Sequence, residues 1–359
     1  MLIVVRAGGI GTRLWPYSRR QRPKQFHRVV GPQSMLQDAV ARVRPLCGPD
    51  ELYVSTGARL APLVREQVPD LPDGHLILEP ALRNTGPAVG LECVLLEARH
   101  PGCTIASVGS DQHVGRPEEY RRLLKVGAAA LEVLPEALLA VGVRPTRAET
   151  GYGYIRKGRE VARCLDEPVF GVEAFTEKPD ETRARAWVAS GQYLWNSNIF
   201  VWKARTVLGL LERHEPEVHA LLMEIRAAAG TPRQQEVIER VYPQMKDVSI
   251  DNAVVERATS VLTLEGDIAW SDIGSWGSLP DVLPVDGAGN LLSGTVLSLD
   301  ARNVTAYGPH GKVLALVDVE DLVVVDTPDA LLICRRDRAQ RVKDVVWRLQ
   351  QDEELRRYT

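Results

Sequence analysis

The residues best suited to chemistry lie near the beginning of the sequence. A short apolar run, Leu2–Val5, leads into the segment AGGIGTRLWPYSRRQRPKQF, which spans Ala7–Phe26. Gly8, Gly9 and Gly11 lift the steric limits on a turn, so that backbone N–H groups can converge on phosphate oxygens. No Gly-Lys-[Ser/Thr] motif follows, and the glycine spacing differs from the dinucleotide-binding fingerprint. The pattern predicts a phosphate-binding loop of a different kind.

Two cations follow these glycines. Arg13 can bind two phosphate oxygens at once through its planar guanidinium, and Lys24 offers a compact point charge. The alternative is a tight turn followed by a solvated basic stretch, which the presence of both cations disfavours.

Two aspartates are candidate magnesium ligands. Asp111 follows the apolar run Thr104–Val108, and Asp272 lies in the segment WSDIGSW beside a glycine turn. Mg2+ takes oxygen ligands and commonly uses one or two carboxylates together with substrate phosphates. For Asp111 considered alone, a turn or capping role is the alternative.

A polar segment, EPALRNTGP, covers Glu79–Pro87 and follows another short apolar run. This placement suits a ligand pocket at the carboxyl ends of strands. The carboxylate of Glu79 can accept hydrogen bonds from the N1–H and the exocyclic amine of guanine together. Asn84 or Thr85 could instead cap a helix, with Pro87 in its first turn.

Three further segments are weak signals when taken singly. Thr150–Ile155 is typical of a glycine-kinked hairpin, the Glu177-Lys178 pair of a surface ion pair, and Trp195–Phe200 of ordinary strand packing.

Taken in this order, the segments resemble those of the sugar-1-phosphate nucleotidyltransferases. Trp15-Pro16 and Pro23-Lys24-Gln25-Phe26 are similar to mannose-1-phosphate guanylyltransferases in particular, and so is Glu79–Pro87. The resemblance extends from Met1 to about Leu349.

The resemblance implies a role for each segment. Arg13, Lys24 and Lys178 would be catalytic, and Asp111 and Asp272 would hold Mg2+. The nucleotide-binding residues it implies are Ala7, Gly8, Gly9, Gly11, Thr12, Arg13, Glu79, Arg83, Asn84, Thr85 and Ser110. The sugar-phosphate-binding residues it implies are Tyr152, Gly153, Glu177, Lys178 and Asn196.

Three positions depart from the family pattern. Arg6 stands where an apolar residue is usual, so its charge should face the loop or solvent. Gln112 intervenes between Asp111 and His113, which leaves the role of His113 open. Asn252 replaces the usual tyrosine in Ser249–Ala253, a stretch interpreted as structural or near the site.

The elements that must position these residues alternate between strands and helices. Apolar runs such as Leu52–Ser55 and Leu76–Leu78 alternate with helical patterns at Pro87–Arg99 and Glu118–Leu134. This predicts an α/β, Rossmann-like nucleotidyltransferase domain over residues 1–284, with a mostly parallel mixed sheet.

Short strand-like runs at roughly ten-residue spacing follow the Gly-rich stretch after Pro284. They predict a small all-β domain over 285–359, flat or coiled like a β-helix, ending in a helix at about 338–355 that serves packing or a homodimer.

Composition excludes several classes of function. The 359 residues are 45% hydrophobic and 25% charged with a net charge of −3, which gives no electrostatic case for binding nucleic acid or an anionic membrane. No apolar run approaches the ~18 residues of a membrane span. Five scattered cysteines suit a reducing compartment, so we expect a cytoplasmic protein.

The implied reaction converts GTP and mannose 1-phosphate into GDP-mannose and pyrophosphate, by in-line attack of the sugar phosphate on the α-phosphate with Mg2+. Two alternatives stay open: the same transfer with another nucleotide or sugar, such as glucose 1-phosphate, and a regulatory protein that binds a GDP-sugar without catalysis. Some bacterial relatives continue into a cupin-like isomerase domain; we expect a single activity here.

Overall fold

The computed structural model describes residues 1–308 and 311–359. These residues form two compact units. Unit 1 consists of Met1–Gly8, Val40–Gly109 and Val114–Trp270, and unit 2 consists of Gly9–Ala39, Ser110–His113 and Ser271–Thr359. Each unit is therefore assembled from segments that lie far apart in the sequence.

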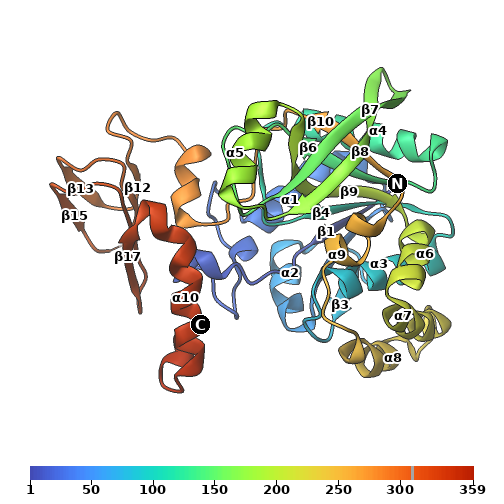
Figure 1. Ribbon diagram of the computed structural model, residues 1–359. Helices are drawn as coiled ribbons and strands as arrows, with labels where there is room; N and C mark the ends of the chain where they lie inside the picture. Colours follow the sequence, from blue (N-terminus) through green and yellow to red (C-terminus); the bar gives the residue numbers. More distant parts are fainter. Residues whose placement is uncertain (309–310) are drawn as a thin grey trace. The chain divides into compact units, whose positions relative to one another are not determined.

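Unit 1 is built on a nine-stranded mixed sheet (Figure 1). Its strands are β1 (Leu2–Arg6), β2 (Leu52–Gly57), β3 (Leu76–Glu79), β4 (Thr104–Gly109), β6 (Leu138–Val143), β7 (Gly153–Cys164), β8 (Glu167–Glu177), β9 (Tyr193–Lys203) and β10 (Val261–Gly266). They lie in the order β3-β2-β1-β4-β9-β6-β10-β8-β7. The first four of these pair in parallel, whereas β9 runs antiparallel to both β4 and β6.

The predicted α/β fold is confirmed, and burial explains why the strands read as apolar runs. The four residues Leu2–Val5 are all buried, as expected for a strand in the middle of a sheet covered on its faces. The helices are α1 (Met35–Val43), α2 (Ala61–Gln67), α3 (Thr85–Arg99), α4 (Pro117–Val133), α5 (Glu181–Ser190), α6 (Ala204–His214), α7 (Pro216–Ala228), α8 (Gln234–Val241) and α9 (Ile250–Ala253).

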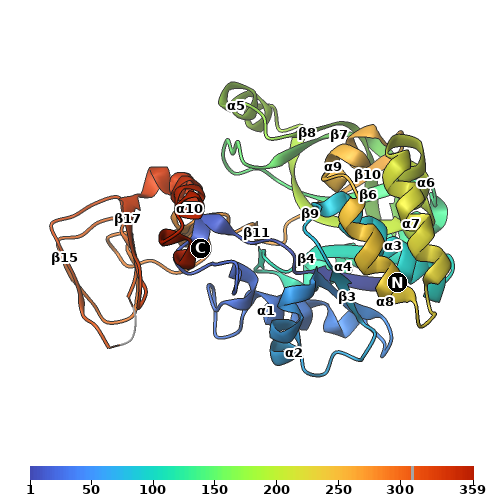
Figure 2. The same ribbon diagram turned by 90° about the horizontal axis from the view of Figure 1, so that it is seen from below.

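Helices α3, α6, α7 and α8 gather together in both views of the chain (Figures 1 and 2). Their packing is close: a Cβ added to Gly90 in α3 would lie 2.5 Å from a methyl group of Leu222 in α7. A side chain at this position would therefore require the packed side chain of Leu222 to shift.

Strands β7 and β8 form a long antiparallel hairpin, paired from Gly153 with Glu177 to Cys164 with Glu167. The chain turns at Leu165 and Asp166, which have φ of 48° and 65°. The interpretation of Thr150–Ile155 as a hairpin is therefore wrong, because these residues lead into one continuous strand.

The C-terminal part of unit 2 is a coiled arrangement of short strands. These are β12 (Leu291–Ser293), β13 (Val296–Leu299), β14 (Thr305–Tyr307), β15 (Leu314–Val317), β16 (Leu322–Asp326) and β17 (Leu331–Arg335), followed by helix α10 (Val342–Gln351). The predicted all-β unit with a terminal helix is confirmed.

The parallel pairings β13–β15 and β14–β16 in this coil join residues eighteen positions apart, whereas β12–β14 joins residues fourteen positions apart. Val296 pairs with Leu314 and Thr305 with Val323, so that β12, β14 and β16 lie side by side. Asp300 and Asp318, at equivalent corners, both adopt positive φ. Aspartate tolerates this backbone region better than most residues, which lets the corner recur without glycine.

The N-terminal segment of unit 2 packs on the C-terminal elements of the same unit. Trp276 is fully buried, and its indole N–H donates to the carbonyl oxygen of Trp15 at 2.9 Å. The indole of Trp15 donates in turn to the carbonyl oxygen of Tyr358 at 2.8 Å. The segment that carries the phosphate loop thus shares a core with the last helix, and the predicted domain boundary at 284/285 stays a prediction.

Among the helices of the described residues, none combines the length and the apolar character that crossing a lipid bilayer requires.

Candidate active site

The glycine-rich loop begins in unit 1 at the carboxyl end of β1. The amide of Ala7 donates to the carbonyl oxygen of Ser55 at 2.7 Å, and the hydroxyl of Thr56 donates to the carbonyl oxygen of Ala7, also at 2.7 Å. A Cβ added to Gly8 would lie 3.5 Å from Glu79 Oε1. The carboxylate of Glu79, which is predicted to bind guanine, therefore lies beside the start of the loop.

The rest of the loop belongs to unit 2, where side chains hold its carbonyl groups. Gln25 Nε2 donates to the carbonyl oxygen of Gly9 at 3.0 Å, and Ser18 Oγ donates to that of Ile10 at 2.5 Å. Gly11 has φ of 65°, which favours glycine. With these carbonyl groups engaged, the loop amides are the backbone groups suited to meet an anion.

Lys24 contacts several of the predicted site residues that belong to unit 2. Its Nζ is 3.1 Å from Asp111 Oδ2 and donates to the carbonyl oxygen of Asp272 at 3.1 Å. The lysine is 8% exposed and packs against Gly11. Arg13, by contrast, makes neither a hydrogen bond nor an ion pair with any residue in the described ranges, so its guanidinium is available to a ligand.

The two predicted metal ligands both contact the ammonium group of Lys24, Asp111 through its carboxylate and Asp272 through its backbone carbonyl oxygen. Asp111 is 40% exposed, and Asp272 Oδ1 accepts from the amide of Gly274 at 2.8 Å. Residues 1–308 and 311–359 contain no group of three or more histidine, cysteine or acidic residues able to hold a metal alone. Two carboxylates completed by substrate phosphates are the kind of oxygen donor set that Mg2+ accepts, so these residues fit the ion.

Ile273, directly after Asp272, has φ of 45° although it is β-branched and fully buried. Such a backbone costs on the order of 1–3 kcal/mol and persists only where the surrounding structure holds it. Strain here accompanies the turn that places the Asp272 carboxylate.

On the base side, in unit 1, Glu79 is buried at the end of β3. The hydroxyl of Tyr242 donates to Glu79 Oε2 at 2.7 Å. Burial raises the pKa of Glu79, while the Tyr242 hydrogen bond and the charge of Arg6 lower it. One carboxylate oxygen is thus held by the protein, while the other, Oε1, lies toward Gly8.

The rest of this segment is tied to residues 243–250. Arg83 donates to the carbonyl oxygen of Pro243, and the side chain of Asn84 donates to Asp247 at 3.1 Å. Asn84 also caps α3, accepting from the amide of Thr85 at 2.9 Å. The capping alternative is therefore confirmed for Asn84, whereas nucleotide binding by Arg83, Asn84 and Thr85 stays a prediction.

On the sugar side, also in unit 1, the predicted residues come together around Gly153. A Cβ added there would lie 2.5 Å from Glu177 Oε2 and 3.2 Å from Asn196 Cβ, so a side chain at this position would require Glu177 to move. Lys178 forms an ion pair with Glu177 at 2.5 Å, with its side chain 58% exposed. The amide of Lys178 donates to the carbonyl oxygen of Tyr152 at 3.2 Å.

Comparison with known proteins is consistent with this arrangement. A sequence model of the nucleotidyl transferase family matches residues 2–286, and one of the MannoseP isomerase/GMP-like beta-helix domain matches residues 294–349. The chain is 36% identical to a mannose-1-phosphate guanylyltransferase of Escherichia coli over 358 residues, which are 98% of this chain and 74% of that protein. The chain belongs to the mannose-1-phosphate guanylyltransferase family.

Two other proteins are similar to this chain over most of its length. The chain is 37% identical to the xanthan biosynthesis protein XanB of Xanthomonas campestris pv. campestris over 352 residues, which are 96% of this chain and 72% of that protein. The crystal structure of a protein named mannose-1-phosphate geranyltransferase from Thermus thermophilus matches with a TM-score of 0.85 and 33% identity, covering 97% of this chain and 99% of that one.

Family membership makes the chain a nucleotidyltransferase enzyme. Sugar 1-phosphates and nucleoside triphosphates are substrates that fit this family, and its members generally use a divalent metal ion.

One residue beside the predicted sugar-phosphate-binding residues escaped the sequence interpretation. Asn196 Nδ2 donates to Asp251 Oδ1 at 3.4 Å, which places Asp251 of α9 among the sugar-side residues. Burial and the charge of Glu177 raise the pKa of Asp251 to about 6. The only sequence signal was its position within Ser249–Ala253, a stretch already interpreted as structural or near the site.

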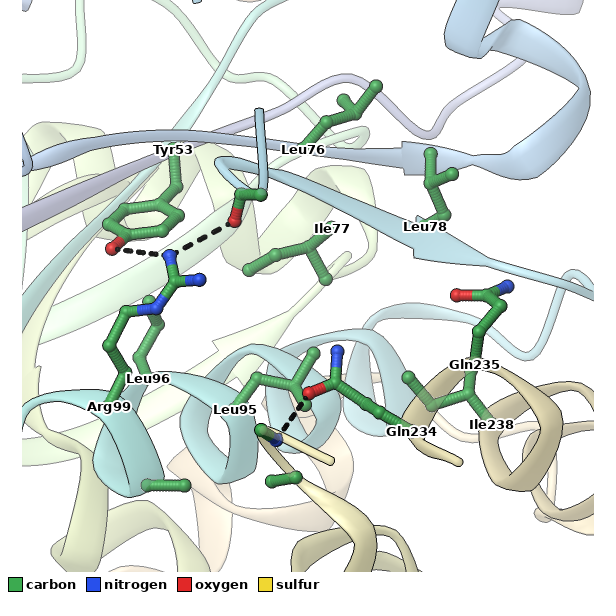
Figure 3. Close-up of a pocket in the computed structure, with 14 residues that line it drawn as sticks. Tyr53, Leu76, Ile77, Leu78, Leu95, Leu96, Arg99, Gln234, Gln235 and Ile238 are labelled. Carbon is green, nitrogen blue, oxygen red and sulfur yellow. Dashed lines mark hydrogen bonds between the residues drawn. The ribbon is translucent and has the colours of Figure 1, made fainter. Parts of the chain in front are cut away.

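Unit 1 also contains a separate, mostly apolar cavity of about 400 Å³ (Figure 3). It is lined by β3, by the C-terminal part of α3 and by α8. Arg99 at its rim donates to the hydroxyl of Tyr53 and the carbonyl oxygen of Gly74, and Gln234 accepts from the amide of Gly230. The predicted site residues do not line this cavity, and these polar rim groups already have partners.

Proposed function

We propose that this enzyme transfers GMP from GTP to α-D-mannose 1-phosphate, giving GDP-mannose and pyrophosphate. The observation that carries the proposal is the buried Glu79, with Oε2 bonded to Tyr242 and Oε1 facing Gly8 of the phosphate loop. A carboxylate can accept from the N1–H and the amino group of guanine together, a pattern that adenine, cytosine and uracil do not offer. The name of the Escherichia coli relative supports the same substrates.

No protein nucleophile is needed, because the sugar phosphate carries an anionic oxygen that can attack the α-phosphate in line. Arg13 and Lys24 would bind the triphosphate and stabilise the charge that develops on it. Asp111 and Asp272 would hold Mg2+, which when bound neutralises charge on phosphate oxygens. Catalysis is then mainly positioning and electrostatic stabilisation.

The attacking sugar phosphate would be anchored by Lys178. Glu177 and Asn196 would accept and donate hydrogen bonds to sugar hydroxyls, and Gly153 would let the sugar approach the backbone. These assignments are supported by the close approach of Gly153, Glu177 and Asn196. A homodimer and a cytoplasmic location, both expected from the sequence, stay predictions.

The proposal predicts pyrophosphate release with Mg2+ only when GTP and mannose 1-phosphate are supplied together. The measurement crosses four nucleoside triphosphates with the 1-phosphates of mannose, glucose and N-acetylglucosamine. Release with a different pair would keep the transfer chemistry and reject the substrate assignment. An enzyme silent with every pair that still binds GDP-mannose would contradict the catalytic proposal.

Glu79→Gln is expected to reduce kcat/KM for GTP at least tenfold and to narrow the preference for GTP over ATP. An amide cannot accept from two guanine donors at once, and a hydrogen bond to a charged group contributes about 1.5–3 kcal/mol. Glu118→Gln, in which the same change is made on an 85% exposed side chain, is the matched control. An unchanged ratio of GTP to ATP turnover in Glu79→Gln would show that Glu79 does not recognise guanine.

A further inference from the structure

The side chain of Asn196 is held in one orientation by two contacts on opposite sides of its amide group. Its Oδ1 accepts from the backbone N–H of Asn198 at 3.1 Å, and its Nδ2 donates to Asp251 Oδ1 at 3.4 Å. A peptide N–H only donates and an ionised carboxylate only accepts, so the two ends of the amide cannot exchange places. Asn196 is buried, and within residues 1–308 and 311–359 its Nδ2 makes no second hydrogen bond. One N–H of the amide is therefore free to bind a ligand.

The backbone of β9 is distorted where it carries Asn196. Gly142 of β6 pairs with Asn196 and Ala140 with Phe200, so four positions along β9 lie opposite two along β6. Asn198, inside this bulge, has φ of 60°. Bulges beside active sites commonly change the direction of a side chain. Here the bulge brings the N–H of Asn198 to the amide oxygen of Asn196.

Asp251 reaches this amide from a segment that is anchored at the start of α3 in unit 1. The amide of Gly86 donates to the carbonyl oxygen of Val248 at 2.9 Å, and the amide of Ile250 donates to Thr85 Oγ1 at 2.8 Å. A Cβ added to Gly86 would lie 2.6 Å from the same carbonyl oxygen, which shows how closely the two segments approach. Ile250 is fully buried. The place of Asp251 is therefore fixed by its neighbours in the chain.

We propose that Asp251 is a positioning residue that orients the amide of Asn196, so that its free N–H can donate to a hydroxyl of the sugar substrate. This role rests on the transfer to mannose 1-phosphate proposed above and deepens it by assigning a residue that sets the geometry of sugar binding. Asn196 lies against Gly153, where a Cβ would be 3.2 Å from Asn196 Cβ. Asp251 acts on the sugar through Asn196.

Asp251→Ala is expected to raise KM for mannose 1-phosphate about tenfold, while kcat and KM for GTP stay within about twofold of wild type. The variant removes the acceptor that fixes the amino group of Asn196 and leaves the predicted base and metal residues unchanged. In Asp251→Asn an amide oxygen can replace the carboxylate oxygen, so KM should return to within about threefold of wild type. Steady-state pyrophosphate release, with each substrate varied in turn, measures these effects.

A cycle with Asn196→Ala determines whether Asp251 acts through Asn196 or binds the sugar itself. If Asp251 acts through Asn196, adding Asp251→Ala to Asn196→Ala should raise KM less than about twofold further, because residues that act together are not additive. Asp73→Ala is the control for loss of a carboxylate, since this aspartate of unit 1 is 95% exposed and pairs with Arg65. Full additivity would overturn the positioning role.

Calorimetric binding of GDP-mannose and of GDP tests the inference without turnover, because the two ligands differ by the mannosyl group. We expect Asp251→Ala to bind GDP-mannose about tenfold more weakly and GDP as tightly as wild type. Asp251→Leu, similar in shape to aspartate but without an acceptor, repeats the test if alanine destabilises the fold.

Wild-type affinity for GDP-mannose in these variants would overturn the inference, and so would an equal loss of affinity for both ligands, which general damage to unit 1 would cause. Failure of the proposed function would show in the wild-type protein instead, as an absence of transfer from GTP to mannose 1-phosphate.

Discussion

Asp111→Ala and Asp272→Asn are each expected to reduce turnover at least a hundredfold while leaving the fold intact. Lys24 Nζ contacts the carboxylate of Asp111 and the backbone carbonyl oxygen of Asp272, and the loss of either carboxylate would leave a bound metal ion with a single protein carboxylate. Removing one preorganised charge at a reacting phosphate costs on the order of 3 kcal/mol, which corresponds to about a hundredfold in rate. Steady-state pyrophosphate release over a range of Mg2+ concentrations measures the effect.

The substitutions are chosen to spare the structure. Asparagine at 272 keeps the oxygen that accepts from the amide of Gly274, and Asp111 is exposed enough for alanine to leave no buried cavity. Asp300→Asn, at a left-handed corner of unit 2 where asparagine is equally suited, is the control and should retain full activity. Near-normal turnover by either site variant at low Mg2+ would contradict the metal assignment.

The α/β fold could be predicted because its central strands are buried along their whole length. Leu2–Val5 and Thr104–Val108 read as strands for this reason, since a strand covered on both faces has no polar alternation. The hairpin of β7 and β8 could not be placed correctly. It turns at Leu165 and Asp166, where neither glycine nor proline marks the turn, and the glycines at 151 and 153 lie at its beginning.

The candidate site likewise contains residues that the sequence could predict and contacts that it could not. Lys24 and the two aspartates are close together as the family resemblance implies, although their roles stay predictions. The contact of Glu79 with Tyr242 and that of Asn196 with Asp251 join residues far apart in the sequence, and no local pattern reports such pairs. Pairing of this kind depends on tertiary packing.

Backbone strain is the other property hidden from the sequence. Lys178 and Ile273, both beside predicted functional carboxylates, have φ of 50° and 45°, a region that neither residue type favours. Propensity would place them in extended or helical backbone. Their conformation is imposed by the surrounding fold, so that only the structure could show it.

Lys24→Met should reduce kcat at least a hundredfold, and Gly11→Ala should reproduce much of that loss by displacing Lys24. A Cβ on Gly11 would lie 2.7 Å from Lys24 Cγ, and φ of 65° would add strain to any side chain there. Because Lys24 Nζ is held between Asp111 and the carbonyl oxygen of Asp272, a shift of its chain would break contacts to both.

A double-mutant cycle distinguishes displacement of Lys24 from a general effect of loop strain. If Gly11→Ala acts through Lys24, adding it to Lys24→Met should lower kcat by less than about threefold further, since neighbours that act together are not additive. Gly102→Ala places a side chain at a similar φ of 77° with no heavy atom within 4 Å, and should leave kcat unchanged. Full additivity in the cycle would show that the alanine damages the phosphate loop independently of Lys24. Additivity would also mean that the contact between Gly11 and Lys24 does not set the position of the ammonium.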